Sequence, residues 1–287
     1  DPYYSNQWHL PVINASQAWN ITTGDTNVII AIVDDAIDLD HEDLADNIFT
    51  NWAEYHGVDG VDDDFNGYVD DVHGWDFAEN NNDPNPAIDN QTHGTHVAGC
   101  ASAATNNGVG VAAPGWKCKI LPLKFSNDNS GSLSGDNAAA IIYAADMGAT
   151  LTNNSYGGGG YSNYNRDAFL YAHELGTLSL TSAGNSDENE ASYPAAYPNV
   201  LSVASTASGD YKSSFSTYHL SVDISSPGSG ILSAYPNNDY ASASGTSMAS
   251  PVAAGVAGLI KSNFPDLTAS ELAIRLSATA DNIYDIN

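Results

Sequence analysis

Three side chains that could together perform nucleophilic catalysis stand where buried elements are expected to begin or end. A serine nucleophile needs a base that takes its proton and a carboxylate that holds the base in one tautomer. Asp34 directly follows an apolar run, and His93 and Ser247 each stand at the start of a run of small residues. In a parallel α/β sheet such positions meet at one edge. The sequence therefore predicts that Asp34, His93 and Ser247 form one catalytic set.

Asn185 has the side chain that stabilisation of a transition state requires. An oxyanion that develops during acyl transfer needs preorganised hydrogen-bond donors. Asn185 ends the segment Ser182-Ala-Gly-Asn185, which follows another apolar run. We expect its side-chain amide to project into the same cleft.

The elements that must position these groups alternate along the chain, which is typical of βαβ units and a parallel sheet. The run 28–33 is apolar at every position and predicts a central strand. Further predicted strands are 120–124, 150–155, 178–183 and 200–204. Predicted helices cover 134–147 and 247–263, and a last helix opens with a capping box at Thr268 and Glu271. Without a repeat or linker, we expect one α/β domain over residues 1–287, with a parallel central β-sheet flanked by helices.

These segments resemble the subtilisin-like serine proteases, which carry their catalytic residues in the chain order Asp, His, Ser. The resemblance rests on His93-Gly-Thr-His-Val-Ala-Gly99 and Gly245-Thr-Ser-Met-Ala-Ser-Pro251, and it extends over almost the whole chain. It implies that Asp34 orients the base, His93 is the general base and Ser247 is the nucleophile. It also implies that Asn185 donates to the oxyanion beside the backbone N–H of Ser247, with Thr246 in support.

Each of these residues also has a simpler interpretation. An aspartate after a strand is usually a turn former, and a histidine in a small-residue helix is usually a core residue, as we expect for His96. The joint occurrence of four motifs in one order favours the catalytic interpretation. The segment Asp34-Asp35-Ala36 departs from the family's usual Asp-Ser/Thr-Gly. Two alternatives to a broadly specific endopeptidase stay open: a catalytically silent binding domain and a processing protease of narrow specificity.

The resemblance also implies a substrate pocket. One wall resembles the family's strand that pairs with the substrate backbone, a mode of binding in which the peptide adds a β-strand. Ser192 falls where the family often has glycine at the pocket floor. We expect a pocket for large apolar or aromatic side chains, lined by Ser155, Tyr156, Gly157, Ser182, Gly184 and Ser192.

Residues 58–71 form an acidic, glycine-punctuated loop that predicts a calcium site. Asp62, Asp64 and Asn66 alternate and are followed by Gly67, like the first half of a calcium loop. The terminal glutamate of an EF-hand is missing, and similar loops bind calcium in the resembled family. We expect oxygen ligands from Asp62, Asp64, Asn66, the carbonyl of Tyr68, and Asp70 and Asp71. A solvated acidic turn is the alternative.

The composition limits the possible partners. Seven Lys and Arg stand against 35 Asp and Glu, which gives a formal charge of −28. Such a surface repels nucleic acid and anionic membranes, so we expect neither as a partner. The resemblance implies polypeptide substrates, and we expect a monomer. No run approaches the roughly 20 apolar residues of a membrane span. We expect a secreted protein whose signal segment has been removed, and a catalytic domain cut from a longer precursor.

The two cysteines, Cys100 and Cys118, permit a single disulfide. The segment 93–99 and the strand at Ile120 should lie side by side, and secretion supplies oxidising conditions. We therefore predict a Cys100–Cys118 bridge. Two small core residues with free thiols are the alternative.

Overall fold

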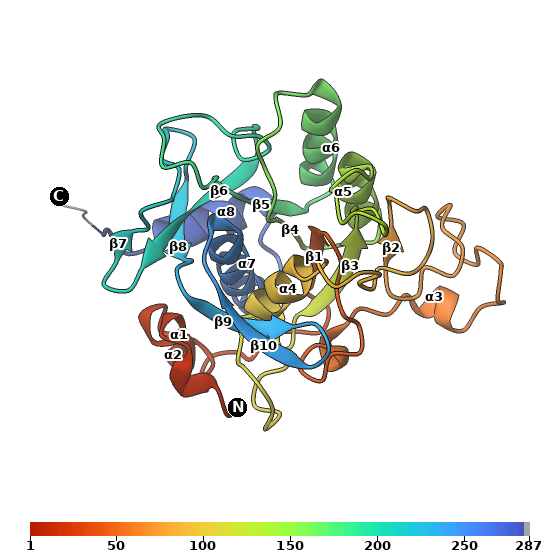
Figure 1. Ribbon diagram of the computed structural model, residues 1–287, viewed down its shortest axis with the longest axis horizontal. Coiled ribbons are helices and arrows are strands. Elements are labelled where there is room, and N and C mark those ends of the chain that lie inside the picture. Colours follow the sequence, from red (N-terminus) through yellow and green to blue (C-terminus); the bar gives the residue numbers. More distant parts are fainter. Residues whose placement is uncertain (284–287) are drawn as a thin grey trace.

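The computed structural model describes residues 1–283 and is built on a mostly parallel sheet (Figure 1). The strand order is β2-β3-β1-β4-β5-β6-β7, with β8 paired to β6, and every pairing is parallel except β6–β7. The strands are β1 (Ile29–Asp34), β2 (Trp75–Asp76), β3 (Lys119–Lys124), β4 (Leu151–Asn154), β5 (Leu178–Ser182), β6 (Val200–Ala207), β7 (Tyr211–Lys212) and β8 (Ile224–Pro227). A separate antiparallel hairpin consists of β9 (Ile231–Tyr235) and β10 (Asp239–Ala243).

Helices cover both faces of the sheet, and each face has its own apolar core. On one face lie α4 (His93–Ser102), α7 (Thr246–Asn263) and α8 (Ala269–Ala278); on the other lie α5 (Asn137–Asp146) and α6 (Asn163–Glu174). Ile30 and Ile32 of β1 belong to the first core, whereas Ala31 and Val33 belong to the second. This alternation is why β1 needs apolar residues throughout, because both of its faces are buried.

Short helical segments complete the described structure. They are α1 (His9–Val12), α2 (Ala15–Ala18), α3 (Trp52–Tyr55) and two 3₁₀ turns, Tyr4–Asn6 and Ala45–Asn47. Within residues 1–283, none of the helices combines the length and the apolar character that crossing a membrane requires.

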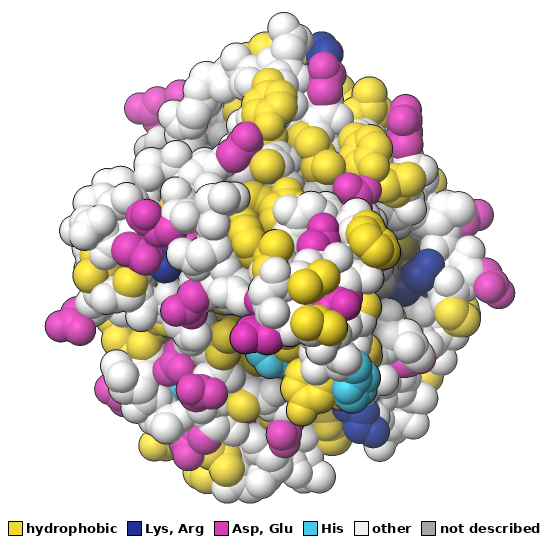
Figure 2. Space-filling view, turned by 90° about the vertical axis from the view of Figure 1, so that its right-hand side faces the viewer, with side chains coloured by type: hydrophobic (Ala, Val, Ile, Leu, Met, Phe, Trp, Pro, Cys, Tyr) yellow, Lys and Arg dark blue, Asp and Glu magenta, His cyan; other side chains and the backbone are white. Residues whose placement is uncertain are grey.

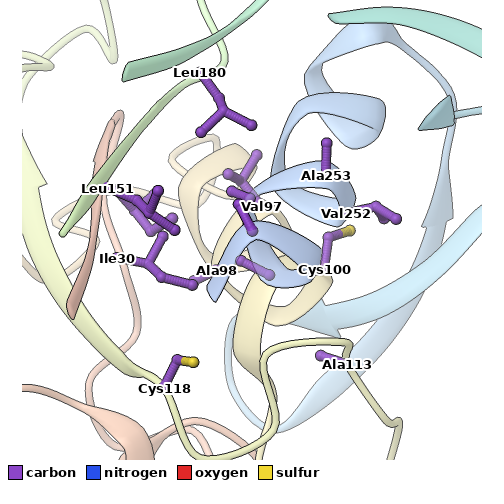
Figure 3. Close-up of a cluster of buried hydrophobic side chains, with 14 of the residues drawn as sticks. Ile30, Val97, Ala98, Cys100, Ala113, Cys118, Leu151, Leu180, Val252 and Ala253 are labelled. Carbon is purple, nitrogen blue, oxygen red and sulfur yellow. The ribbon is translucent and has the colours of Figure 1, made fainter. Parts of the chain in front are cut away.

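Small residues let α4 and α7 pack closely inside the first core (Figure 3). A Cβ placed on Gly255 of α7 would stand 2.4 Å from the carbonyl oxygen of Ala101 in α4. A Cβ on Gly99 of α4 would stand 2.4 Å from the Ser233 hydroxyl of β9. The small-residue runs are therefore a packing requirement: they bring the two helices that begin with His93 and Thr246 close together.

The predicted strands and helices are confirmed to within a few residues. The helix expected from residue 134 begins at Asn137, because the Asp136 side chain accepts the N–H groups of Ala138 and Ala139 and caps it there. The capping box of Thr268 and Glu271 is present. Elements outside the predicted set are α6, the short helices α1 to α3, the strands β2, β7 and β8, and the hairpin β9–β10.

The predicted disulfide is wrong: Cys100 and Cys118 are free and buried. Figure 3 shows the two sulfur atoms well apart within the first core. The sulfur of Cys100 lies 3.6 Å from Nδ1 of His96, and that of Cys118 lies 3.9 Å from the Ser262 hydroxyl. Burial raises the pKa of Cys100 to about 12 and that of Cys118 to about 11. Both are therefore small core residues with unreactive thiols, which was the alternative interpretation.

Candidate active site

The predicted catalytic residues lie at strand ends and helix starts. Asp34 is the last residue of β1, His93 is the first residue of α4, and Ser247 is the second residue of α7. Asn185 follows the end of β5, which is separated from β1 only by β4. Because parallel strands end at the same edge of a sheet, four residues that are far apart in sequence are delivered to one region.

Asp34 and His93 form a short hydrogen bond. Nδ1 of the imidazole lies 2.7 Å from Oδ1 of Asp34, whose side chain is 5% exposed, while the His93 side chain is 37% exposed. Partial burial lowers the pKa of His93, but the charge and hydrogen bond of Asp34, together with the charge of Asp35, outweigh it and raise the pKa to about 9. The arrangement holds the Nδ1–H tautomer, which makes Nε2 the acceptor.

Ser247 makes a reciprocal pair of hydrogen bonds with Ser155, the residue after β4. The Ser247 hydroxyl donates to the carbonyl oxygen of Ser155 at 3.1 Å, and the Ser155 hydroxyl donates to the carbonyl oxygen of Ser247 at 2.8 Å. Within residues 1–283, the Ser247 hydroxyl has no hydrogen bond to His93. This hydroxyl is therefore directed toward the predicted substrate strand. Hydrogen bonds between a nucleophile and its base often align only when substrate binds.

Thr246 determines how the Asn185 amide is oriented. Oδ1 of Asn185 accepts both the backbone N–H and the hydroxyl of Thr246, each at 2.9 Å. This leaves Nδ2 as a donor. A Cβ placed on Gly245 would stand 3.5 Å from Nδ2 of Asn185 and 3.5 Å from the backbone nitrogen of Ser247. Nδ2 of Asn185 and the backbone N–H of Ser247 thus flank the position that a side chain of residue 245 would occupy. No side chain fills that position, because residue 245 is glycine.

The structure brings the predicted pocket residues together. A Cβ on Gly157 would stand 3.3 Å from the Ser192 hydroxyl oxygen, and a Cβ on Gly184 would stand 3.6 Å from the same atom. The Ser182 hydroxyl lies 3.5 Å from the carbonyl oxygen of Tyr156. The Ser192 hydroxyl therefore lies beside both glycines, and a Cβ on Gly184 would also meet the Thr217 hydroxyl oxygen at 2.9 Å.

The predicted core histidine behaves as expected. His96 is 3% exposed, and its Nε2 lies 3.1 Å and 3.0 Å from the carbonyl oxygens of Ile231 and Ala241. Burial and the charge of His93 lower the pKa of His96 to about 4. His96 is therefore neutral at ordinary pH and joins α4 to the hairpin β9–β10.

The acidic loop brings together a carboxylate cluster that differs from the predicted set. Glu54, Asp62 and Asp64 each have a carboxylate oxygen within 4.8 Å of the others. Glu54 lies in α3, outside the loop pattern, and is 5% exposed. Its Oε1 accepts the N–H groups of Asp63 and Asp64, and its Oε2 accepts that of Asp70. Nothing in the loop motif indicates Glu54, since only folding places α3 beside the loop.

Of the other predicted carboxylate ligands, Asp70 and Asp71 lie outside this cluster. The carboxylate of Asp70 accepts the N–H of Gly60, and that of Asp71 accepts hydrogen bonds from Asn51, Asn66 and Tyr143. The Tyr68 ring packs against the Trp75 ring. Asn66 hydrogen-bonds to Asp64 and Asp71. Asp71 is fully buried. The Tyr143 hydroxyl donates to its carboxylate, so Asp71 anchors the loop to α5.

Comparisons with known proteins agree with this geometry. Residues 25–285 match the model of the Subtilase family. The chain is 41% identical over 283 residues to the halolysin-like extracellular serine protease Nep of Natrialba magadii, covering 99% of this chain and 49% of Nep, so it spans about half the length of that relative. It is 41% identical over 285 residues to thermitase of Thermoactinomyces vulgaris, covering 99% and 91%.

A solved structure is similar over the whole fold. A protease from Pseudoalteromonas arctica PAMC 21717 superposes with a TM-score of 0.83 at 28% identity, covering 98% of this chain and 92% of that one. The sequence matches, the parallel sheet and the Asp34–His93 pair at its edge point to one assignment. This chain belongs to the subtilase family of serine endopeptidases.

Proposed function

We propose that this chain hydrolyses internal peptide bonds of polypeptides through an acyl-enzyme on Ser247. The observation that carries the proposal is the 2.7 Å bond between Asp34 and His93, formed at the sheet edge that also receives Ser247 and Asn185. A buried carboxylate that orients a histidine base is what activation of a serine hydroxyl requires. In this reaction Asp34 is the orienting acid and His93 is the general base.

The chain's own groups account for each step. When substrate binds, the Ser247 hydroxyl leaves the Ser155 carbonyl, transfers its proton to Nε2 of His93 and attacks the scissile carbonyl carbon. The oxyanion of the tetrahedral intermediate accepts hydrogen bonds from Nδ2 of Asn185 and the N–H of Ser247. His93 then gives its proton to the leaving amine as the C–N bond breaks. A water molecule, deprotonated by His93, hydrolyses the acyl-enzyme and regenerates the Ser247 hydroxyl.

A covalent probe tests the proposal directly. A fluorophosphonate that reacts with activated serines should label the parent protein at Ser247, and labelling should disappear in Ser247→Ala and His93→Ala. Peptide mapping by mass spectrometry identifies the modified residue. A folded parent protein that is neither labelled nor active would show that the domain is a silent binding module.

We also propose broad cleavage with a preference for large apolar or aromatic residues on the acyl side of the scissile bond. Support comes from the resemblance to the family's pocket and from the meeting of Gly157, Gly184 and Ser192 at one place, where the Ser192 hydroxyl limits the depth open to a substrate side chain. A peptide library should give scattered cleavages with this preference. A single preferred motif would instead indicate a processing protease.

We propose that a calcium ion stabilises the acidic loop. The donor set fits: Glu54, Asp62 and Asp64 offer three hard oxygen ligands within 4.8 Å of one another, and calcium takes six to eight oxygens. A bound ion would neutralise part of the repulsion among these carboxylates. Asn66 and the carbonyl of Tyr68 remain candidate further ligands within the same loop.

We propose that the protein acts outside the cell as a monomer. One relative is described as an extracellular protease. On the face of the molecule that includes α3, acidic side chains far outnumber basic ones (Figure 2), and such a surface disfavours nucleic acid and anionic membranes. Sedimentation of the inhibited protein tests the monomer; a concentration-dependent dimer would contradict it.

A further inference from the structure

Asp35 follows Asp34 and contacts the helix that carries His93. Its Oδ2 accepts the backbone N–H of His93 at 3.0 Å, and its Oδ1 accepts that of Gly94 at 2.7 Å. Oδ1 also accepts the N–H of Ala36 at 2.6 Å, and the residue is 7% exposed. Building on the proposed function, we propose that Asp35 is a positioning residue: its carboxylate caps α4, and its charge acts on the His93 imidazole.

The cap comes from a different element of the chain. The first N–H groups of a helix have no partner within the helix, and the side chain of the N-cap residue usually accepts one of them. Thr92, the N-cap of α4, makes no such hydrogen bond. Asp35 takes over this role from the end of β1 and satisfies two of these donors. Its negative charge also lies at the positive end of the helix dipole.

The start of α4 packs closely against the turn that follows β1. A Cβ placed on Gly94 would stand 2.4 Å from the carbonyl oxygen of Ala36 and 3.0 Å from Cβ of Asp34, so the start of α4 presses on the turn after β1. The Ser126 hydroxyl donates to the carbonyl oxygen of Asp35 at 2.5 Å. Asp35 is thus held through both its side chain and its backbone. The Asp35 carboxylate, next in sequence to the orienting acid, accepts two backbone hydrogen bonds from the start of the helix that carries His93.

The charge of Asp35 acts on His93 directly. Burial and the charge of Asp34 raise the pKa of Asp35 to about 6, so Asp35 is ionised at alkaline pH. That charge is one of the influences that raise the pKa of His93. The other charged or titratable groups around this pair are Asp34 on β1, His96 on α4, Tyr156 after β4, and Lys124 on β3, which is paired with Asp76 and Asp128.

The sign of the pH effect follows from these contacts. His93 acts as a base only when it is neutral, so kcat/KM should rise with pH through the pKa of His93. Removing the negative charge of Asp35 makes the imidazolium less stable and lowers that pKa. The acid limb of the profile should then move to lower pH.

Three variants separate charge from position. Asp35→Asn removes the charge and keeps one of the two oxygen acceptors, the one that can face the N–H groups of Gly94 and Ala36. The acid limb should move by about half a pH unit or more to lower pH, with KM nearly unchanged. Asp35→Ala removes the cap, and kcat should fall about tenfold because His93 is less well positioned; Asn should restore most of it. Asp40→Asn is the matched control, because Asp40 is exposed and makes no side-chain hydrogen bond within residues 1–283.

A second readout does not depend on catalysis. In a Ser247→Ala background, NMR titration of the His93 ring should show a lower pKa when Asp35→Asn is added, and no change with Asp40→Asn. An unchanged pKa of His93 in Asp35→Asn would overturn the claim that the charge of Asp35 acts on His93. Full kcat in folded Asp35→Ala would overturn the positioning part. If Asp35→Ala does not fold, the kcat and the His93 titration of Asp35→Asn test the proposal, and parent values for both would overturn it. Failure of the peptidase proposal itself would appear as an inactive, unlabelled parent, while the titration still tests Asp35.

Discussion

Different interactions hold the catalytic edge, which is the sheet edge with Asp34, His93, Asn185 and Ser247, and the acidic loop of residues 58–71. Asp34 and His93 are held by elements whose other side chains fill two apolar cores, as with β1 and α4. The loop 58–71 has little such support: Tyr68 packs against the second core, but Phe65 is 89% exposed. Its shape instead depends on carboxylates, such as Glu54 and Asp62, that accept backbone N–H groups. Apolar burial needs no counter-ion, whereas clustered carboxylates repel one another.

This contrast predicts which property, catalytic chemistry or stability, a substitution in each region should change. At the catalytic edge, single substitutions should change the chemistry while leaving the fold intact. In the loop, substitutions and loss of cations should change stability while leaving the chemistry intact. Experiments that find the reverse in either region would break the comparison.

The largest effect should come from the proposed nucleophile. Ser247→Ala should remove peptidase activity, because loss of the nucleophile in such a triad costs on the order of 10⁶ in kcat. The melting temperature should stay close to that of the parent. Activity assays together with thermal melts check both expectations, and retention of more than a small residual activity would refute the role of Ser247.

The oxyanion donors should give the next largest effect. Asn185→Ala should lower kcat by about 10²–10³ with little change in KM, because the amide acts on the transition state. Gly245→Ala should act in the same direction, since its methyl group would lie 3.5 Å from both donors. Steady-state kinetics measure kcat and KM separately for each variant. A change confined to KM would place Asn185 in substrate binding instead.

Removal of calcium should affect stability without affecting the triad. Calcium at about 100 times its dissociation constant adds roughly 2.7 kcal/mol if only the folded state binds it. The melting temperature of the inhibited enzyme should therefore fall in EDTA, with autolysis near the loop in uninhibited samples.

Matched variants locate the ion. Glu54→Gln should reduce the calcium-dependent rise in melting temperature, whereas Asp59→Asn, an exposed loop carboxylate outside the cluster, should retain it. Equal melts with EDTA and calcium in the parent would exclude a stabilising site. A full calcium response in Glu54→Gln would place the ion elsewhere.

The smallest expected effect concerns the thiols. Because Cys100 and Cys118 are free, a reductant should leave the melting temperature unchanged. Because both are buried and burial raises their pKa, iodoacetamide should modify neither in the folded protein and both after denaturation. Intact-mass measurement shows the modifications. A mass two hydrogens lower than that of the dithiol would show that Cys100 and Cys118 form a disulfide after all.

The sequence alone determined the local features. The apolar run 28–33, the small-residue runs after His93 and Ser247, and the capping box at Thr268 each predicted an element that the structure contains. These patterns succeed because burial on one or both faces dictates residue type along the element itself. Asp34, His93 and Ser247 were identifiable because they adjoin such elements within motifs that occur together in one order.

Tertiary structure decided what lies between elements. The sequence spacing of Cys100 and Cys118 allowed a disulfide, but the positions of α4 and the chain before β3 direct the two sulfurs to different partners. Glu54 joins Asp62 and Asp64 because α3 folds back onto the loop, and Asp35 caps α4 because β1 ends beside it. Hydrogen bonds and ion clusters act over a few ångströms in space, so residues distant in sequence give no periodic signal that they will meet.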